Sequence, residues 1–222
     1  MAVADKPSAR QAKRLQTRER LMGAAVAEFK RAGMAAADIG TIVSAAGVAH
    51  GTFFFHFPTK EHVLLELERR EEERISAQFI RYVNSVSDLG AKLTEAIRLV
   101  RGLEQRLGAI LFKDFLALHF SPTRPAAEGA QDHSMVVLIA REIERAQALG
   151  EADAQADAMN SAVFFLLGLY ALLVTTHDWP TQGEMLEDYV CRTLRGLGVC
   201  QWAGLGPAAD GTAIRPCRPA QR

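Results

Sequence analysis

The sequence predicts an all-α protein with a small N-terminal part and a larger helical body. Apolar residues recur at i, i+3, i+4 and i+7 along most of the chain, which is the period of an amphipathic helix. No segment shows sustained alternation of apolar and polar residues, so no β-sheet is expected. Glycine and proline stand between the periodic segments, where they end helices.

The first amphipathic helix is predicted to run from near Leu15 to Gly33. Its apolar stripe consists of four residues at helical spacing, namely Met22, Ala25, Val26 and Phe29. Basic residues in its last turn and a glycine after it are typical of a helix end. Residues 1–14 precede the stripe and are expected to form a basic arm.

The two short helices that follow predict a helix-turn-helix. Asp38 is a suitable N-cap for the first, which is expected to end at Gly47, where a glycine permits a positive φ. The second is expected to span residues 50–57 and to end before Pro58. Two short helices joined by a glycine-containing turn, behind a supporting helix, place the second helix in the major groove of DNA.

The basic residues gather in the same part of the chain. Residues 1–60 contain nine Lys or Arg and four Asp or Glu, whereas the remainder contains 17 basic and 22 acidic residues. A chain of zero net charge therefore divides into parts of +5 and −5. Such asymmetry indicates that the basic part meets a polyanion, although chance clustering would give the same totals.

Residues 50–60 carry the predicted DNA contacts. Phe53 and Phe57 lie four residues apart and are expected to face inward. Among their neighbours, a small residue would let the backbone approach DNA. Hydroxyl, methyl and ring groups would meet base edges, and cationic side chains would meet phosphates. The residues expected to contact DNA are His50, Gly51, Thr52, Phe54, Phe55, His56 and Lys60.

The rest of the chain is also predicted to be helical. A long helix is expected from Lys60. Five more helices are expected at about residues 88–105, 108–120, 132–149, 153–177 and 183–198, with a surface loop at 121–132. Residues 201–222 are rich in glycine, proline and alanine without periodicity, so a disordered tail is expected there.

Residues 17–67 resemble the DNA-binding domain of the tetracycline-repressor (TetR) family. The resemblance rests on "TRERLMGAAVAEFKRAG", "AAGVAHGTFFFHF" and "FPTKE", which occur in the family's order. It implies an all-α homodimer with a DNA-reading head at residues 15–61 and a ligand-binding, dimerisation body at 62–200, whose last two helices form a four-helix bundle with the partner. It also implies that Thr52, His56 and Lys60 contact DNA and that Gly51 allows close approach.

Three positions depart from the family pattern. Phe54 stands where a tyrosine is usual, so a hydroxyl directed at phosphate is absent. Gly40 occupies a position that is frequently basic, and Asp38 one where threonine often caps and touches phosphate. The departures suggest weaker contact with the DNA backbone or a different operator, within the same fold.

The body contains two segments too apolar for surface helices, at residues 108–120 and 162–179. Packing of a core explains them by itself. The cavity implied by the resemblance would be lined by Phe112, Phe115, His119, Phe165, Tyr170 and Trp179. Such a lining favours a hydrophobic ligand of fatty-acyl, aromatic or drug-like character. The expected dimer interface comprises Phe164, Gly168, Leu172, Leu186, Tyr189 and Leu194.

Enzymatic function is not expected, because no nucleophile–base pair is recognisable, and no catalytic residue or cofactor is assigned. The three cysteines lack metal-ligand spacing, so no metal site is expected. No secretory signal follows Met1, and the longest apolar run, residues 162–174, has 13 residues, short of a bilayer span. The expectation is therefore a cytoplasmic regulator, most simply a repressor released from a palindromic operator by a hydrophobic small molecule. A ligand-independent architectural protein or activator is the alternative.

Overall fold

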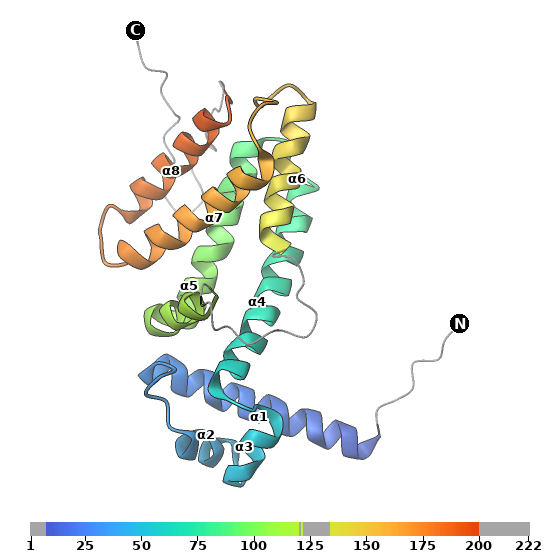
Figure 1. Ribbon diagram of the computed structural model, residues 1–222, viewed down its shortest axis with the longest axis vertical. Helices are drawn as coiled ribbons and strands as arrows, with labels where there is room; N and C mark the ends of the chain where they lie inside the picture. Colours follow the sequence, from blue (N-terminus) through green and yellow to red (C-terminus); the bar gives the residue numbers. More distant parts are fainter. Residues whose placement is uncertain (1–7, 120, 122–133, 200–222) are drawn as a thin grey trace. The chain divides into compact units, whose positions relative to one another are not determined.

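The computed structural model describes residues 8–119, 121 and 134–199. This part of the chain contains eight α-helices and no strand, which confirms the all-α prediction (Figure 1). The helices are α1 (Ala9–Ala32), α2 (Ile39–Ala46), α3 (His50–His56), α4 (Lys60–Val83), α5 (Leu89–His119), α6 (Ser134–Ala148), α7 (Ala158–Thr175) and α8 (Gln182–Gly196). The predicted tail at residues 201–222 lies outside the described residues.

The described residues form two compact units. Unit 1 comprises residues 8–69, 107–119 and 121, and unit 2 comprises residues 70–106 and 134–199. Both α4 and α5 therefore contribute residues to each unit. Within α5, Gly108 interrupts the helical backbone with φ 75° and ψ 159°, a conformation that residues with a Cβ rarely adopt. The two helices predicted at 88–105 and 108–120 are the two parts of α5.

Unit 1 is built around aromatic and aliphatic side chains from its short helices. In it α1 packs on α2, and α2 packs on α3. The core residues that are at most 1% exposed include Leu21, Phe29, Ile42, Phe53 and Phe57. The predicted inward orientation of Phe53 and Phe57 is confirmed. These two rings lie 6.0 Å apart between centroids, so they close the small core together.

The first helix begins earlier than the sequence predicted. The sequence placed its start near Leu15, but α1 begins at Ala9. Ser8 and Gln11 form a capping box: the Gln11 amide donates to Ser8 Oγ at 3.3 Å, and the Ser8 amide donates to Gln11 Oε1 at 2.8 Å. The apolar stripe could not reveal these turns, because every residue from 8 to 16 is exposed.

In unit 2, α7 packs against both α6 and α8 (Figure 1). One face of α7 is buried, including Ala162, Phe165, Leu166, Leu169 and Leu173. By length and composition alone this 18-residue helix could also cross a bilayer. The unbroken apolar run at residues 162–174 is shorter, so the sequence did not indicate this. Here its buried face serves as part of the core of unit 2.

The contact between α7 and α8 depends on a close approach at Gly168. A Cβ at this position would overlap the phenol of Tyr189. The Tyr189 hydroxyl donates to the carbonyl oxygens of Phe164 (3.0 Å) and Phe165 (2.8 Å), and its ring stacks on Phe165 with centroids 5.6 Å apart. Burial raises the pKa of Tyr189 to about 12, so the phenol remains a donor at neutral pH.

Replacing Gly168 by alanine should therefore destabilise the protein. We expect a loss of about 1–3 kcal/mol in the free energy of unfolding, because the added methyl group displaces Tyr189 from α7. Urea denaturation would measure it. Gly183→Ala in α8 is the matched control, since a Cβ there meets nothing within 4 Å. Equal effects of the two substitutions would contradict the close approach at Gly168.

Candidate nucleic-acid interface

The helices α2 and α3 form the predicted helix-turn-helix, and both predicted caps of α2 are present. Asp38 Oδ2 accepts from the Thr41 amide at 2.7 Å and from the Thr41 hydroxyl at 2.9 Å, and these bonds lower the pKa of Asp38. Gly47 ends α2 in the left-handed conformation, with φ 65° and ψ 43°. The chain then reverses into α3, whose N-cap residue is Ala49.

Five of the predicted DNA contacts lie on accessible parts of α3. Phe54 and Phe55 are 46% and 67% exposed, which is unusual for such large apolar side chains. His50 is exposed and its ring lies 5.7 Å from that of Phe54. Thr52 is half-buried, and within the described part of the chain its hydroxyl has no hydrogen-bond partner. A Cβ at Gly51 would meet nothing within 4 Å, so the fold does not require glycine there.

His56 is placed differently from the outward-facing contacts. Its side chain is on the inner side of α3, three residues after Phe53, and only 9% of the residue is exposed. Burial lowers the pKa of His56, and the nearby charges of Arg18 and Arg14 lower it further. The neutral imidazole is therefore favoured near pH 7, which disfavours the cationic phosphate contact expected from the sequence.

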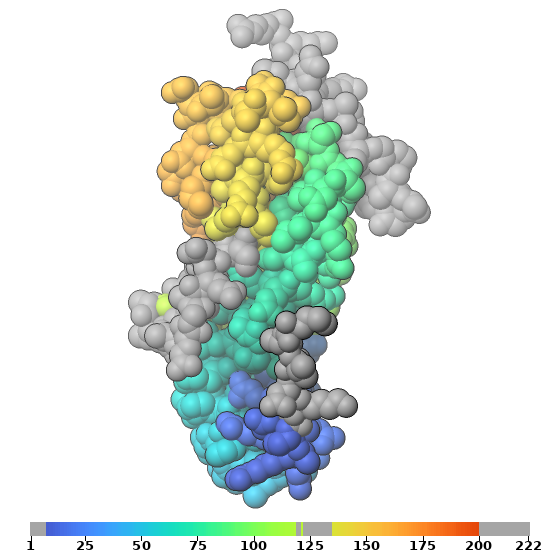
Figure 2. All heavy atoms as spheres, turned by 90° about the vertical axis from the view of Figure 1, so that its right-hand side faces the viewer, coloured from blue at the N-terminus to red at the C-terminus, as the bar shows by residue number. Residues whose placement is uncertain are grey.

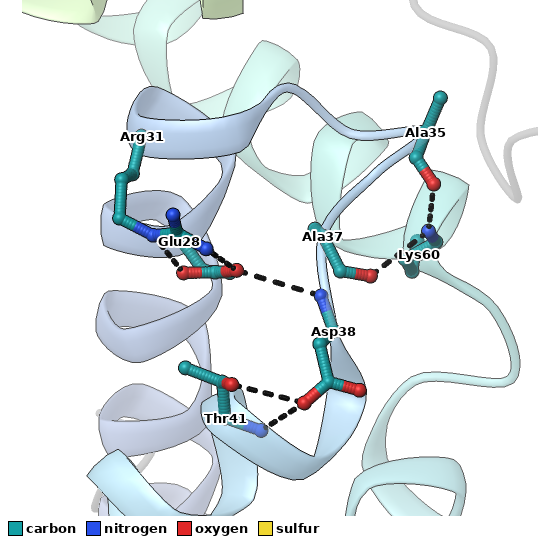
Figure 3. A network of polar contacts seen from close by, with 7 residues as sticks. All are labelled: Glu28, Arg31, Ala35, Ala37, Asp38, Thr41 and Lys60. Carbon is teal, nitrogen blue, oxygen red and sulfur yellow. Dashed lines mark hydrogen bonds and ion pairs between the residues drawn. The ribbon is translucent and has the colours of Figure 1, made fainter.

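Lys60 is also engaged within the protein. Its Nζ donates to the carbonyl oxygens of Ala35, at 2.9 Å, and Ala37, at 3.2 Å (Figure 3). These carbonyls belong to the loop between α1 and α2, where no helix or sheet partner is available to them. The sequence predicted a phosphate contact for this lysine, whereas here its ammonium group binds the loop.

The same loop is held from two further sides. Buried Glu28 pairs with Arg31 at 2.6 and 2.9 Å, which lowers the pKa of Glu28, and it also accepts from the Asp38 amide at 3.5 Å (Figure 3). From the second part of α5, the Asp114 carboxylate accepts from the amide of Met34. The sequence pattern indicated neither the Lys60 contact nor the Asp114 contact, because their partners are backbone groups.

Two arginines of α1 pack on the aromatic side chains of the α3 segment. The Arg18 guanidinium lies 4.2 Å from the centroid of the Phe57 ring and donates to the His56 carbonyl oxygen. The Arg14 guanidinium lies 5.2 Å from the centroid of Phe55. Both distances are within the range of cation–π attraction. The four-residue spacing of these arginines was visible in the sequence, but their aromatic partners were not.

The predicted pocket residues fall in both units. Phe112, Phe115 and His119 belong to α5 in unit 1, and Phe165, Tyr170 and Trp179 belong to unit 2. The first two and Phe165 are buried, Tyr170 is half-buried and Trp179 is 54% exposed, while the side chain of His119 lies outside the described part. The pocket therefore stays a prediction. In the described residues, no three His, Cys, Asp or Glu side chains are grouped so as to hold a metal ion.

The predicted dimer residues differ in how accessible they are. Leu186 and Leu194 are buried within the chain, at 3% and 2% exposure, because they face α7 in the core of unit 2. Gly168 and Tyr189 contact each other, and Leu172 is half-buried. Phe164 is 68% exposed, and α7 also exposes Met159 and Leu167. A contact with a partner chain would therefore use the exposed apolar side of α7.

The position of His56 predicts a dependence of stability on pH. Its pKa is lowered in the folded state, so the unfolded chain binds the proton more readily. The contribution of His56 to the free energy of unfolding should be fully present above the ordinary histidine pKa of about 6.5. It should be lost progressively as the pH decreases below that value. Urea denaturation at about pH 7.5 and about pH 5.5 would reveal this contribution. It should disappear in His56→Gln but persist in His50→Gln; persistence in both would contradict it.

Comparisons with known proteins agree with this architecture. Residues 21–67 match the family model described as "Bacterial regulatory proteins, tetR family". No curated protein matches the sequence. Among solved structures, the fatty acid degradation regulator FadR from Bacillus halodurans has a TM-score of 0.60 and 19% identity, over 81% of this chain and 98% of that chain.

Two further structures were solved with bound molecules. FadR from Thermus thermophilus, a TetR-family repressor in complex with lauroyl-CoA, has a TM-score of 0.60 and 22% identity over 86% of this chain and 98% of its own. AibR, in complex with isovaleryl coenzyme A and operator DNA, has a TM-score of 0.58 and 15% identity over 79% of this chain and 97% of its own. At these identities the likeness establishes the fold. The family model shows that residues 21–67, which include the helix-turn-helix, belong to the tetR family of bacterial regulatory proteins.

Proposed function

We propose that the protein is a ligand-responsive repressor that leaves a palindromic operator when a hydrophobic small molecule binds. The observation that carries the proposal is the accessible side of α3, where His50, Gly51, Thr52, Phe54 and Phe55 are presented by a helix-turn-helix. In this proposal residues 15–61 read DNA, and residues 62–200 bind the effector and dimerise.

The chemistry of this side suits the major groove. Exposed aromatic rings meet thymine methyl groups. The Thr52 hydroxyl, which has no partner among the described residues, donates to or accepts from a base edge or phosphate. The His50 ring, which lies tilted beside that of Phe54, adds one polar group at the start of the helix. Because apolar contacts dominate this surface, the proposal favours an operator with thymines in each half-site.

The dimer part of the proposal rests on the exposed apolar side of α7. Met159, Phe164 and Leu167 are 45%, 68% and 44% exposed, and neighbouring apolar residues exposed on one helix favour a protein contact. A two-fold dimer presents two α3 helices related by symmetry. Its operator would therefore be palindromic, with half-sites separated by a helical turn or a simple multiple of it.

The effector part of the proposal is supported by the apolar character of the body and by the relatives. Thermus thermophilus FadR and AibR were both solved with acyl-CoA thioesters. A ligand of this kind would weaken DNA binding only if it bound better to a state of the dimer that fits the operator poorly. A regulator of this class acts in the cytoplasm, where it meets DNA.

The proposal is tested by selecting duplexes from a random pool with the purified protein. We expect enrichment of one palindrome. We also expect lauroyl-CoA, used as the probe, to release that duplex at concentrations where coenzyme A without an acyl chain does not. Enrichment without release by acyl-CoA or other apolar ligands would favour the ligand-independent architectural protein or activator. Absence of any enriched sequence would contradict specific recognition altogether.

Gly51 offers a direct test of the α3 surface. Alanine at this position should fold normally and could stabilise the protein by up to about 1 kcal/mol, because a Cβ there meets open space and glycine is a poor helix former. Binding to the selected duplex should nevertheless weaken, because the methyl group keeps the backbone away from DNA. Gly23→Ala in α1, also in open space, is the control. Unchanged affinity of both variants would remove Gly51 from the interface.

A further inference from the structure

The first turns of α1 are exposed on every side and carry only basic charges. Residues 8–16 are all exposed, and residues 8–18 contain Arg10, Lys13, Arg14 and Arg18 but no Asp or Glu. Basic side chains near the N-terminus of a helix oppose its dipole, so they reduce the stability of these turns. The fold therefore gains little from this composition. The segment also precedes residues 21–67, which match the family model.

Three of these side chains form one row. Arg10, Arg14 and Arg18 are four residues apart, so they lie on the same face of α1 in successive turns. Arg18 packs on Phe57 and Arg14 on Phe55, so the row follows the α3 segment. Arg10 lies about 6 Å further along the helix axis, toward its N-terminus. We call these three residues the arginine row.

Arg10 and Arg14 of the row have N–H groups available for hydrogen bonding. Arg18 is partly satisfied, because it donates to the His56 carbonyl and lies 3.8 Å from Glu66. No hydrogen bond or ion pair within the described part of the chain engages the N–H groups of Arg10 or Arg14. The cation–π contact of Arg14 with Phe55 occupies no N–H group, so the N–H groups of Arg14 remain available to an anion.

The row adjoins the proposed DNA-reading surface, because Arg14 packs on Phe55, which is part of that surface. Figure 2 shows the blue atoms of α1 directly against the lighter blue and cyan atoms that follow it in unit 1. Two residues that were expected to bind phosphate, His56 and Lys60, are engaged within the protein instead. A duplex held against α3 therefore meets positive charge on α1, where Arg14 lies beside Phe55.

We infer that the arginine row is a second DNA-contact surface, in which Arg10 and Arg14 bind phosphates that flank the bases contacted by α3. The inference rests on the proposed function, because it requires α3 to be seated on DNA. Phe55 then has two roles: its edge faces the bases, and its ring positions Arg14. The flanking contact is independent of base sequence and depends on the length of the duplex.

The test uses the full-length protein and two duplexes that share the selected sequence. One ends at the limits of the selected site, and the other extends by about ten base pairs on each side, one helical turn. Dissociation constants are measured between about 50 and 200 mM salt for the wild type and for Arg10→Gln and Arg14→Gln. Arg20→Gln is the matched control: it removes the same charge from exposed α1, on another face of the helix.

On the long duplex, each row variant should lower the slope of log affinity against log salt concentration by about 0.9 per protomer. When the salt is raised fourfold, the variant should therefore lose about 3.5-fold less affinity per protomer than the wild type loses. On the short duplex the salt slope of Arg10→Gln should equal that of the wild type. The slope of Arg20→Gln should equal that of the wild type on both duplexes. Equal losses by Arg10→Gln on both duplexes, or none on either, would overturn the flanking contact while leaving the proposed function intact. Failure to select any sequence would overturn the proposed function and this inference with it.

Discussion

The placement of α3 is the constraint on which the rest of unit 1 depends. A helix of seven residues is too short to be stable alone, so its orientation must come from tertiary contacts. Phe53 and Phe57 bury its inner side, while Arg18 binds its last carbonyl and packs on Phe57. The exposed rings of Phe54 and Phe55 can then face solvent in a fixed orientation, because the opposite side of the helix is anchored.

Anchoring such a short element removes some of its polar groups from the surface. His56 becomes part of the buried side, and Lys60 binds the carbonyls of the loop that precedes α2. That loop is further fixed by Glu28 and Asp114, so the turn leading into the helix-turn-helix is held by side chains from three helices. Positive charge near α3 is consequently supplied by α1 instead of by α3 itself.

Unit 2 is organised by contacts of a different kind. Lys92 of α5 and Glu142 of α6 form an ion pair of 2.6 Å with both side chains nearly inaccessible. Glu142 also pairs with Arg145 at 3.3 Å, whereas loss of Glu142 would deprive the buried Lys92 ammonium of this carboxylate. Tyr189 and Gly168 bring α8 onto the backbone of α7. These contacts hold the helices of unit 2 against one another as a close-packed group.

The sequence by itself determined the helical class, the short helices near residues 38–46 and 50–57, and the inward position of Phe53 and Phe57. These follow from local rules: the period of apolar residues, the Asp38 cap, the left-handed glycine and the proline after α3. Only the tertiary structure decided which polar groups remain available. The roles of His56, Lys60 and Arg14 depend on a neighbour distant in sequence, and no spacing rule specifies such a neighbour, because burial and hydrogen bonding are set by packing between elements.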